Sequence, residues 1–165
     1  MSRIIKSHVS TALYEGFLVL WLGFIYTNSL KSKADSAAQS EPMEGVLRRL
    51  LALLGFEGDS EGIAEIVVRK AAHIFEFFVL ALLLYLLIRS LGYDRRQCIA
   101  LTAVLAVTAA ALDETLQLFS HRGARITDVF IDSLGILVAF LVVKIGRNAR
   151  KTDGRKTQTD NEKQL

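Results

Sequence analysis

Two neighbouring carboxylates, Asp113 and Glu114, lie inside the apolar stretch 99–119. That stretch is long enough to cross ~30 Å of hydrocarbon, and an ionisable side chain near the middle of a membrane helix costs at least ~2.5–3.5 kcal/mol. A pair placed at such a cost indicates a functional site. Gln117 follows Asp113 by four residues and Glu114 by three, so the three side chains can share one broad helix face.

Carboxylates in two further apolar stretches fall at the same expected depth. Lys70 marks the edge of the stretch 71–91, and Glu76 lies six residues beyond it. Arg125 marks the edge of the stretch 126–145, and Asp132 lies seven residues beyond it. At ~1.5 Å per residue both are roughly 9–10 Å deep, as are the two carboxylates of 99–119. The sequence therefore predicts a carboxylate layer beneath a mostly cationic rim. Its ligand-binding candidates are Lys70, His73, Glu76, Asp113, Glu114, Gln117, Arg122, Arg125, Asp128 and Asp132.

The elements that must position these residues are helices. The chain has 165 residues, 52% of them hydrophobic and 22% charged, which is enough for one domain. Its apolar residues form four blocks of membrane-spanning length, at about 9–30, 71–91, 99–119 and 126–145. Together they predict an all-α fold, a bundle of four transmembrane helices that occupies residues 9–146. The only proline, Pro42, lies outside all four blocks, so no span is expected to be broken by proline.

The loop 31–70 between the first two spans contains one more helical pattern. Leucines at 47, 50, 51 and 54 repeat at the spacing of one helix face. We expect an extra amphipathic helix there, lying on the outer surface or capping the bundle, with Gly55 and Gly58 ending it.

Positive charge predicts the orientation. The side that holds both termini carries twelve lysines and arginines and the other side carries eight, which favours cytoplasmic termini. Residues 1–8 then form a cytoplasmic arm, and 147–165 a basic, disordered cytoplasmic tail that can touch anionic lipid. We expect membrane lipids as partners and no nucleic acid.

The ordered residues Arg69-Lys70-x-x-His73-x-x-Glu76, Asp113-Glu114-x-x-Gln117, Arg122, Arg125 and Asp128-x-x-x-Asp132-x-x-Gly135 resemble the VanZ-like family of bacterial integral membrane proteins. The resemblance runs from the first span to the end of the fourth. It implies a multi-pass protein of the bacterial plasma membrane with a role in the cell envelope, because the founding member is associated with resistance to the glycopeptide teicoplanin. Phe77 and Asp132 stand where tyrosine and asparagine are frequent in that family.

Several functions fit this pattern. The first is noncatalytic: an outer-leaflet polar pocket that binds an anionic lipid or cell-wall headgroup, or the glycopeptide itself, and so affects susceptibility to antibiotics of the teicoplanin type. The second is an enzyme acting on a lipid-linked phosphate, with His73, Glu76, Asp113 and Glu114 as the catalytic candidates. The third is a polar network that serves only helix packing.

A metal site is a further alternative, because His73-x-x-Glu76 and Asp113-Glu114 resemble the ligand sets of helical metalloproteins. Only one histidine reaches full depth, and the expected cations at the rim would repel a metal ion. The sequence expectation is therefore no metal and no cofactor. Whether the chain forms homo-oligomers stays open.

Overall fold

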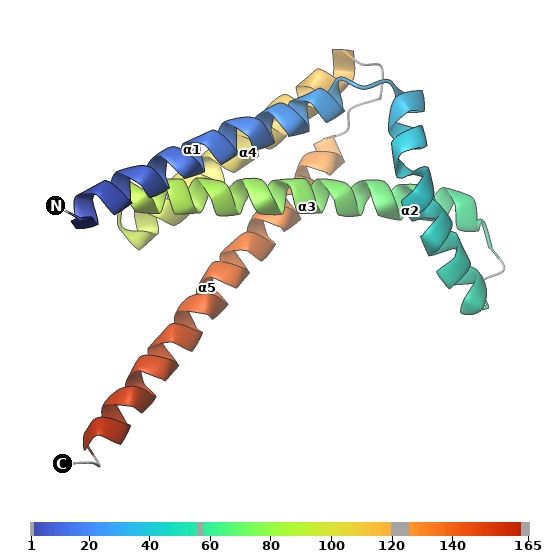
Figure 1. Cartoon of the computed structure of the whole chain (residues 1–165). Helices are drawn as coiled ribbons and strands as arrows, with labels where there is room; N and C mark the ends of the chain where they lie inside the picture. Colours follow the sequence, from blue (N-terminus) through green and yellow to red (C-terminus); the bar gives the residue numbers. More distant parts are fainter. Residues whose placement is uncertain (1, 56–57, 120–125, 163–165) are drawn as a thin grey trace.

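A computed structural model of the chain describes residues 2–55, 58–119 and 126–162; the side chains of 2–9, 33, 126 and 149–162 lie outside the description. The described residues form five helices and no strand, so the predicted all-α fold is confirmed. Figure 1 shows them in chain order: α1 (Ser2–Ser29), α2 (Lys33–Leu53), α3 (Ser60–Ser90), α4 (Arg95–Phe119) and α5 (Ile126–Glu162).

Three helices are long and apolar enough to cross a membrane: Ser60–Ser90, Arg95–Phe119 and Thr127–Asn148 within α5. They expose large apolar side chains such as Val104 (64% exposed) and Phe130 (70%), as expected of surfaces that face lipid. The first predicted span, 9–30, lies almost wholly within α1, which is not among these three helices. A fourth span therefore stays a prediction.

The extra helix between the first two predicted spans is present as α2 and is longer than the leucine pattern alone predicts. It begins at Lys33, where the Ser32 side chain accepts a hydrogen bond from the Asp35 amide at 3.2 Å, and it continues through Pro42. Gly55 follows its end with φ +77°, a conformation that favours glycine, as the sequence predicts.

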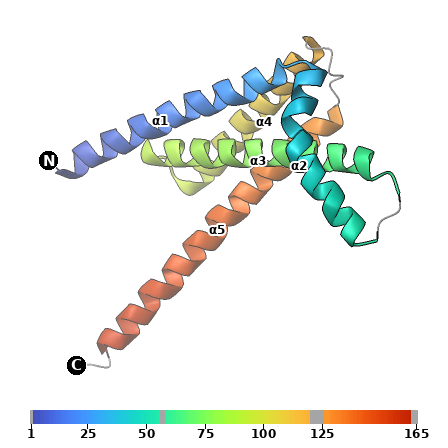
Figure 2. The same ribbon diagram turned by 45° about the vertical axis from the view of Figure 1, so that its right-hand side comes forward.

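Helix α3 is the centre of the fold, because it packs against each of the other four helices. It begins eleven residues before its predicted span, at Ser60, after Asp59 accepts a hydrogen bond from the Gly62 amide at 2.9 Å. Helix α2 lies across the first part of α3, as Figure 2 shows, at the end of the molecule away from the two termini.

Helix α5 continues to Glu162 and so includes most of the segment 147–165, for which the sequence predicts a disordered tail. Lysine, arginine, glutamine and glutamate are good helix formers, and a helix that already exists extends more easily than a new one begins. The structure therefore differs from the prediction in the conformation of this segment.

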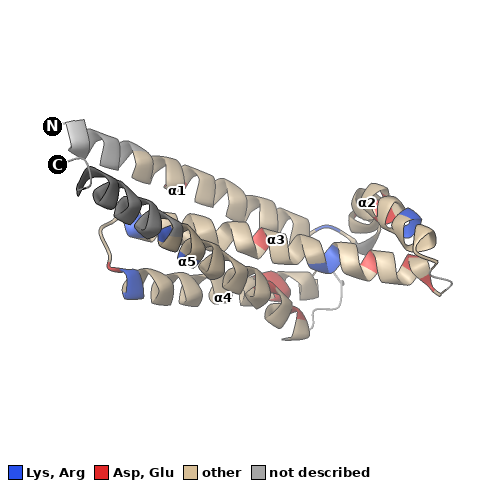
Figure 3. Cartoon of the chain, turned by 90° about the horizontal axis from the view of Figure 1, so that it is seen from below, with Lys and Arg blue, Asp and Glu red and all other residues tan. Residues whose placement is uncertain are grey.

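Small residues allow close packing at the centre. A Cβ atom on Gly135 of α5 would lie 2.2 Å from the backbone oxygen of Ile74 on α3, so the two helix backbones touch there. Ala106, Ala109 and Ala110 of α4 face the same buried core as Phe77 and Leu80 of α3. Figure 3 shows Lys and Arg at the start of α4 and Asp and Glu near its other end, which is the end where the candidate site lies.

Candidate functional site

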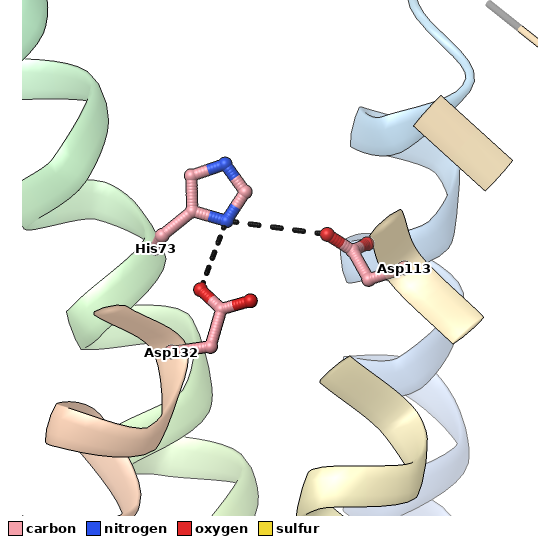
Figure 4. A group of neighbouring side chains, drawn as sticks. All are labelled: His73, Asp113 and Asp132. Carbon is pink, nitrogen blue, oxygen red and sulfur yellow. Dashed lines mark ion pairs between the residues drawn. The ribbon is translucent and has the colours of Figure 1, made fainter. Parts of the chain in front are cut away.

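His73, Asp113 and Asp132 come together from three different helices, α3, α4 and α5 (Figure 4). The Nδ1 atom of His73 lies 3.3 Å from Oδ1 of Asp132 and 4.0 Å from Oδ2 of Asp113. Both carboxylates are fully buried, whereas 17% of the His73 side chain is exposed. Of the four carboxylates that the sequence places at one depth, Asp113 and Asp132 are in this cluster, and His73, three residues beyond Lys70, joins them.

The backbone contact at Gly135 explains how Asp132 reaches His73. Gly135 lies three residues beyond Asp132 on α5, and Ile74 directly follows His73 on α3. Because no side chain separates the two helices at Gly135, the carboxylate one turn away is held against the imidazole. The contact is a packing device that positions the site.

Each oxygen of Asp113 has a hydrogen-bond donor. The Ser29 hydroxyl, on α1, donates to Oδ1, and Nε2 of Gln117, one turn along α4, donates to Oδ2 at 2.8 Å. Both donors are themselves buried. Asp113 is therefore fixed from two helices, and α1 takes part in the site.

Glu76 belongs to a second chain of contacts that leads to the surface. Its Oε1 accepts a hydrogen bond from Nδ2 of Asn28 at 3.2 Å, and Oδ1 of Asn28 accepts one from Nζ of Lys31 at 2.8 Å. Lys31 also donates to Oε1 of Gln39 on α2 at 2.7 Å. The Trp21 indole N–H donates to the backbone oxygen of Glu76 at 2.9 Å, which ties α1 to α3 at this level.

Lys70 and Arg69, the described cations near the expected rim, form ion pairs with partly exposed carboxylates and not with the buried ones. Lys70 lies 3.7 Å from Asp128, and both side chains are partly exposed. Arg69 pairs with Glu65, one turn back along α3. Glu114 is buried on α4 but is not part of the His73 cluster, and Arg122 and Arg125 lie outside the described residues.

A partly open pocket of about 590 Å³ lies between the end of α1, α2 and α3. Of the predicted site residues, His73 and Glu76 line it, together with Lys31 and Arg69, whereas Asp113, Asp132 and Gln117 lie outside its wall. A volume of this size is typical of small-molecule sites.

The α2 wall of this pocket changes from polar to apolar along the helix. Ser36, Gln39 and Ser40 line its first part, beside Lys31. The lining residues of the second part are apolar: Met43, Val46, Leu47 and Leu50. The arrangement suits an amphipathic molecule whose polar end lies near Glu76 and whose apolar part follows α2.

Reasoning from the sequence missed three residues of this region: Asn28, Ser29 and Lys31. Lys31 enters only the count of positive charges, and Asn28 and Ser29 fall inside the first predicted span, 9–30, with no role assigned to them. The sequence did contain a pattern that could have found them. The polar residues 27–29 lie near the end of the first span, and Lys31 follows Asn28 by three residues, a spacing that lets their side chains meet on a helix.

Comparisons with known proteins agree with the resemblance seen in the sequence. The model of the VanZ/LLP1 family matches residues 16–147, whereas no curated protein and no solved structure matches the chain. The matched range covers most of the chain and includes the His73 cluster, the Lys31 chain of contacts and the whole pocket. With its three apolar helices of membrane-spanning length, the chain is a membrane protein that belongs to the VanZ/LLP1 family.

Proposed function

We propose that the pocket between α2 and α3 binds an anionic amphipathic molecule, a membrane lipid or a lipid-linked cell-wall precursor, and that this binding affects the envelope and its susceptibility to glycopeptides of the teicoplanin type. The observation that carries the proposal is the amphipathic wall of the pocket, with polar side chains and Lys31 at one end and four apolar side chains of α2 at the other.

Charge supports an anionic headgroup. Lys31 lines the pocket, and its ammonium group donates to two amide oxygens rather than to a carboxylate of a described residue. An ammonium whose acceptors are neutral amide oxygens is suited to a phosphate, which accepts strong charge-assisted hydrogen bonds. The neighbouring Glu76 is held by Asn28 and does not take this cation.

Location supports a lipid-borne ligand. Helix α2 exposes Met43, Leu50 and Leu53 beside the pocket, and Leu54 directly after its end is exposed too, which suits a helix lying at the interface between hydrocarbon and water. In the proposed topology both termini are cytoplasmic in the bacterial plasma membrane, α1 is a fourth span, and the pocket opens at the outer leaflet. A ligand could then enter it without leaving the membrane.

One substitution tests the headgroup. Lys31→Gln should weaken binding of undecaprenyl phosphate or phosphatidylglycerol about tenfold, because a charged hydrogen-bond donor is lost. The measurement is native mass spectrometry of the purified chain with each lipid and with phosphatidylcholine. Comparing the two anionic lipids separates a cell-wall carrier from a bulk membrane lipid.

Lys144→Gln is the matched control, because Lys144 is exposed on α5 and does not line the pocket. Equal binding by all three proteins would contradict the proposal. In cells, expression of the wild type and of Lys144→Gln should change teicoplanin susceptibility, and expression of Lys31→Gln should do so less.

A second candidate is an enzyme that acts on the same lipid-linked phosphate. It is favoured by His73, which lines the pocket while its Nδ1 faces the buried carboxylate of Asp132, the arrangement that orients a general acid or base. Product formed from undecaprenyl phosphate and lost in His73→Ala would support this candidate over simple binding.

A further inference from the structure

The cluster of His73, Asp113 and Asp132 has the composition of a metal site. One ligand atom from each residue, a histidine nitrogen and two carboxylate oxygens, lies within 4.8 Å of the other two. The three residues come from three helices, and Figure 4 shows the side chains directed toward one another. A metal ion bound at ~2.0–2.2 Å from each ligand atom would place these atoms roughly 3–3.5 Å apart, so a small closure of the cluster is sufficient.

The cluster also lacks the partners that such buried groups require. Asp132 is fully buried, and the contact recorded for its carboxylate among the described residues is the ion pair of Oδ1 with Nδ1 of His73 at 3.3 Å; Oδ2 has no hydrogen-bond donor among them. Unpaired buried polar atoms are destabilising, and unpaired buried charge is more so. A cation held between the ligand atoms of the cluster would supply a partner for them.

Apart from His73 itself, no cation among the described residues pairs with the two carboxylates. Lys70 is paired with Asp128 and Arg69 with Glu65, and no described lysine or arginine forms an ion pair with Asp113 or Asp132. The sequence expectation of no metal rests on the single deep histidine and on repulsion by rim cations. Of those cations, Lys70 has a carboxylate partner elsewhere, and Arg122 and Arg125 lie outside the described residues.

We propose that His73, Asp113 and Asp132 bind a divalent transition-metal ion of the Zn²⁺ or Mn²⁺ type. Imidazole together with carboxylate favours these ions over Ca²⁺, which takes oxygen ligands alone. Ser29 and Gln117 hold the carboxylate of Asp113 in place, as the residues behind metal ligands do. Three protein ligands would leave a further coordination position open.

Metal content of the full-length chain tests the proposal without any lipid. The purified protein is treated with a chelator, incubated with Zn²⁺ or Mn²⁺, desalted and submitted to elemental analysis. We expect about one ion per chain for the wild type and at least a tenfold weaker affinity for Asp132→Asn. Glu15→Gln makes the same kind of change in a carboxylate of α1, outside the cluster, and should bind like the wild type.

Thermal unfolding provides a second readout. The metal should raise the unfolding temperature of the wild type and of Glu15→Gln but not of Asp132→Asn or His73→Gln. Less than about 0.1 ion per wild-type chain overturns the proposal even if the variants fail to accumulate. Unchanged affinity in a folded Asp132→Asn protein, or an equal loss in Glu15→Gln, overturns it too. The lipid assay with Lys31→Gln is separate, so either proposal can fail alone.

Discussion

At the scale of single residues, the site depends on how each buried carboxylate is held. Asp113 receives a hydrogen bond at each oxygen, from Ser29 and Gln117, while Asp132 has the imidazole of His73 as its ion-pair partner at 3.3 Å. Glu76 is held through Asn28 and is linked by it to Lys31 at the pocket. The three carboxylates at one depth therefore have three different environments.

Ser29→Ala tests the hold on Asp113. Removing the hydroxyl leaves a buried carboxylate oxygen without this donor, so we expect the free energy of unfolding to fall by about 1–2 kcal/mol. The measurement is reversible unfolding of the purified protein in detergent. Thr108→Ala is the control, because Thr108 is exposed and its hydroxyl donates only to the Val104 oxygen of its own helix.

Thr108→Ala should change the free energy of unfolding by less than about 0.5 kcal/mol. If both variants unfold alike, the hydroxyl of Ser29 does not support Asp113, and the participation of α1 in the site loses its main argument.

The depth of the carboxylates along each helix was predictable from the sequence, whereas the direction in which each side chain points was not. Residue counts from a membrane edge place Glu76, Asp113, Glu114 and Asp132 at one level, and His73 about one turn nearer the edge. Neighbours such as Asp113 and Glu114 point about 100° apart, so only one of them can join a given cluster. Which one does so depends on how α4 is rotated against α3 and α5, and this follows from packing over the whole interface.

At the scale of helices, the contact of α5 with α3 at Gly135 decides whether the cluster forms. No larger residue fits there, since the added carbon would overlap the Ile74 backbone oxygen. The sequence carries Gly135 in a family-like motif, but its role is visible only once α3 and α5 are packed together.

Gly135→Ala should lower the free energy of unfolding by about 1–3 kcal/mol, because the helices must separate to admit the methyl group. Gly146→Ala, farther along α5 with nothing near the added carbon, should be neutral or stabilising by up to ~1 kcal/mol. Unfolding in detergent measures both. A Gly135→Ala protein as stable as the wild type would show that the close crossing does not hold the site.

Helix α2 illustrates what periodicity can and cannot predict. Its leucines reveal an amphipathic helix, and that helix is present. The polar first half, with Ser36, Gln39 and Ser40, has no strong apolar period, so its helical state follows from the Ser32 cap and from packing on α3. The pocket depends on this first half as much as on the leucines.

At the scale of the whole molecule, α2 and the connection between α3 and α4 lie at opposite ends of α3, as Figure 1 shows. In the proposed orientation the first is outside the cell and the second inside. With Cys98 replaced by Ala, Glu41→Cys should react with an impermeant thiol reagent in intact cells, and Arg96→Cys only after the cells are permeabilised.

If Arg96→Cys reacts in intact cells, the true orientation is the opposite of the proposed one. The pocket would then lie at the cytoplasmic leaflet, where glycopeptides do not reach it.

The central claim is that an amphipathic phosphate ligand binds between α2 and α3. The most direct measurement is photo-crosslinking with an undecaprenyl phosphate analogue that carries a diazirine in its chain, followed by peptide mapping. We predict crosslinks within residues 36–50 of α2 and 67–76 of α3 that decrease when unlabelled undecaprenyl phosphate is added. Crosslinks confined to the exposed faces of α4 and α5, or unaffected by the competitor, would contradict the claim.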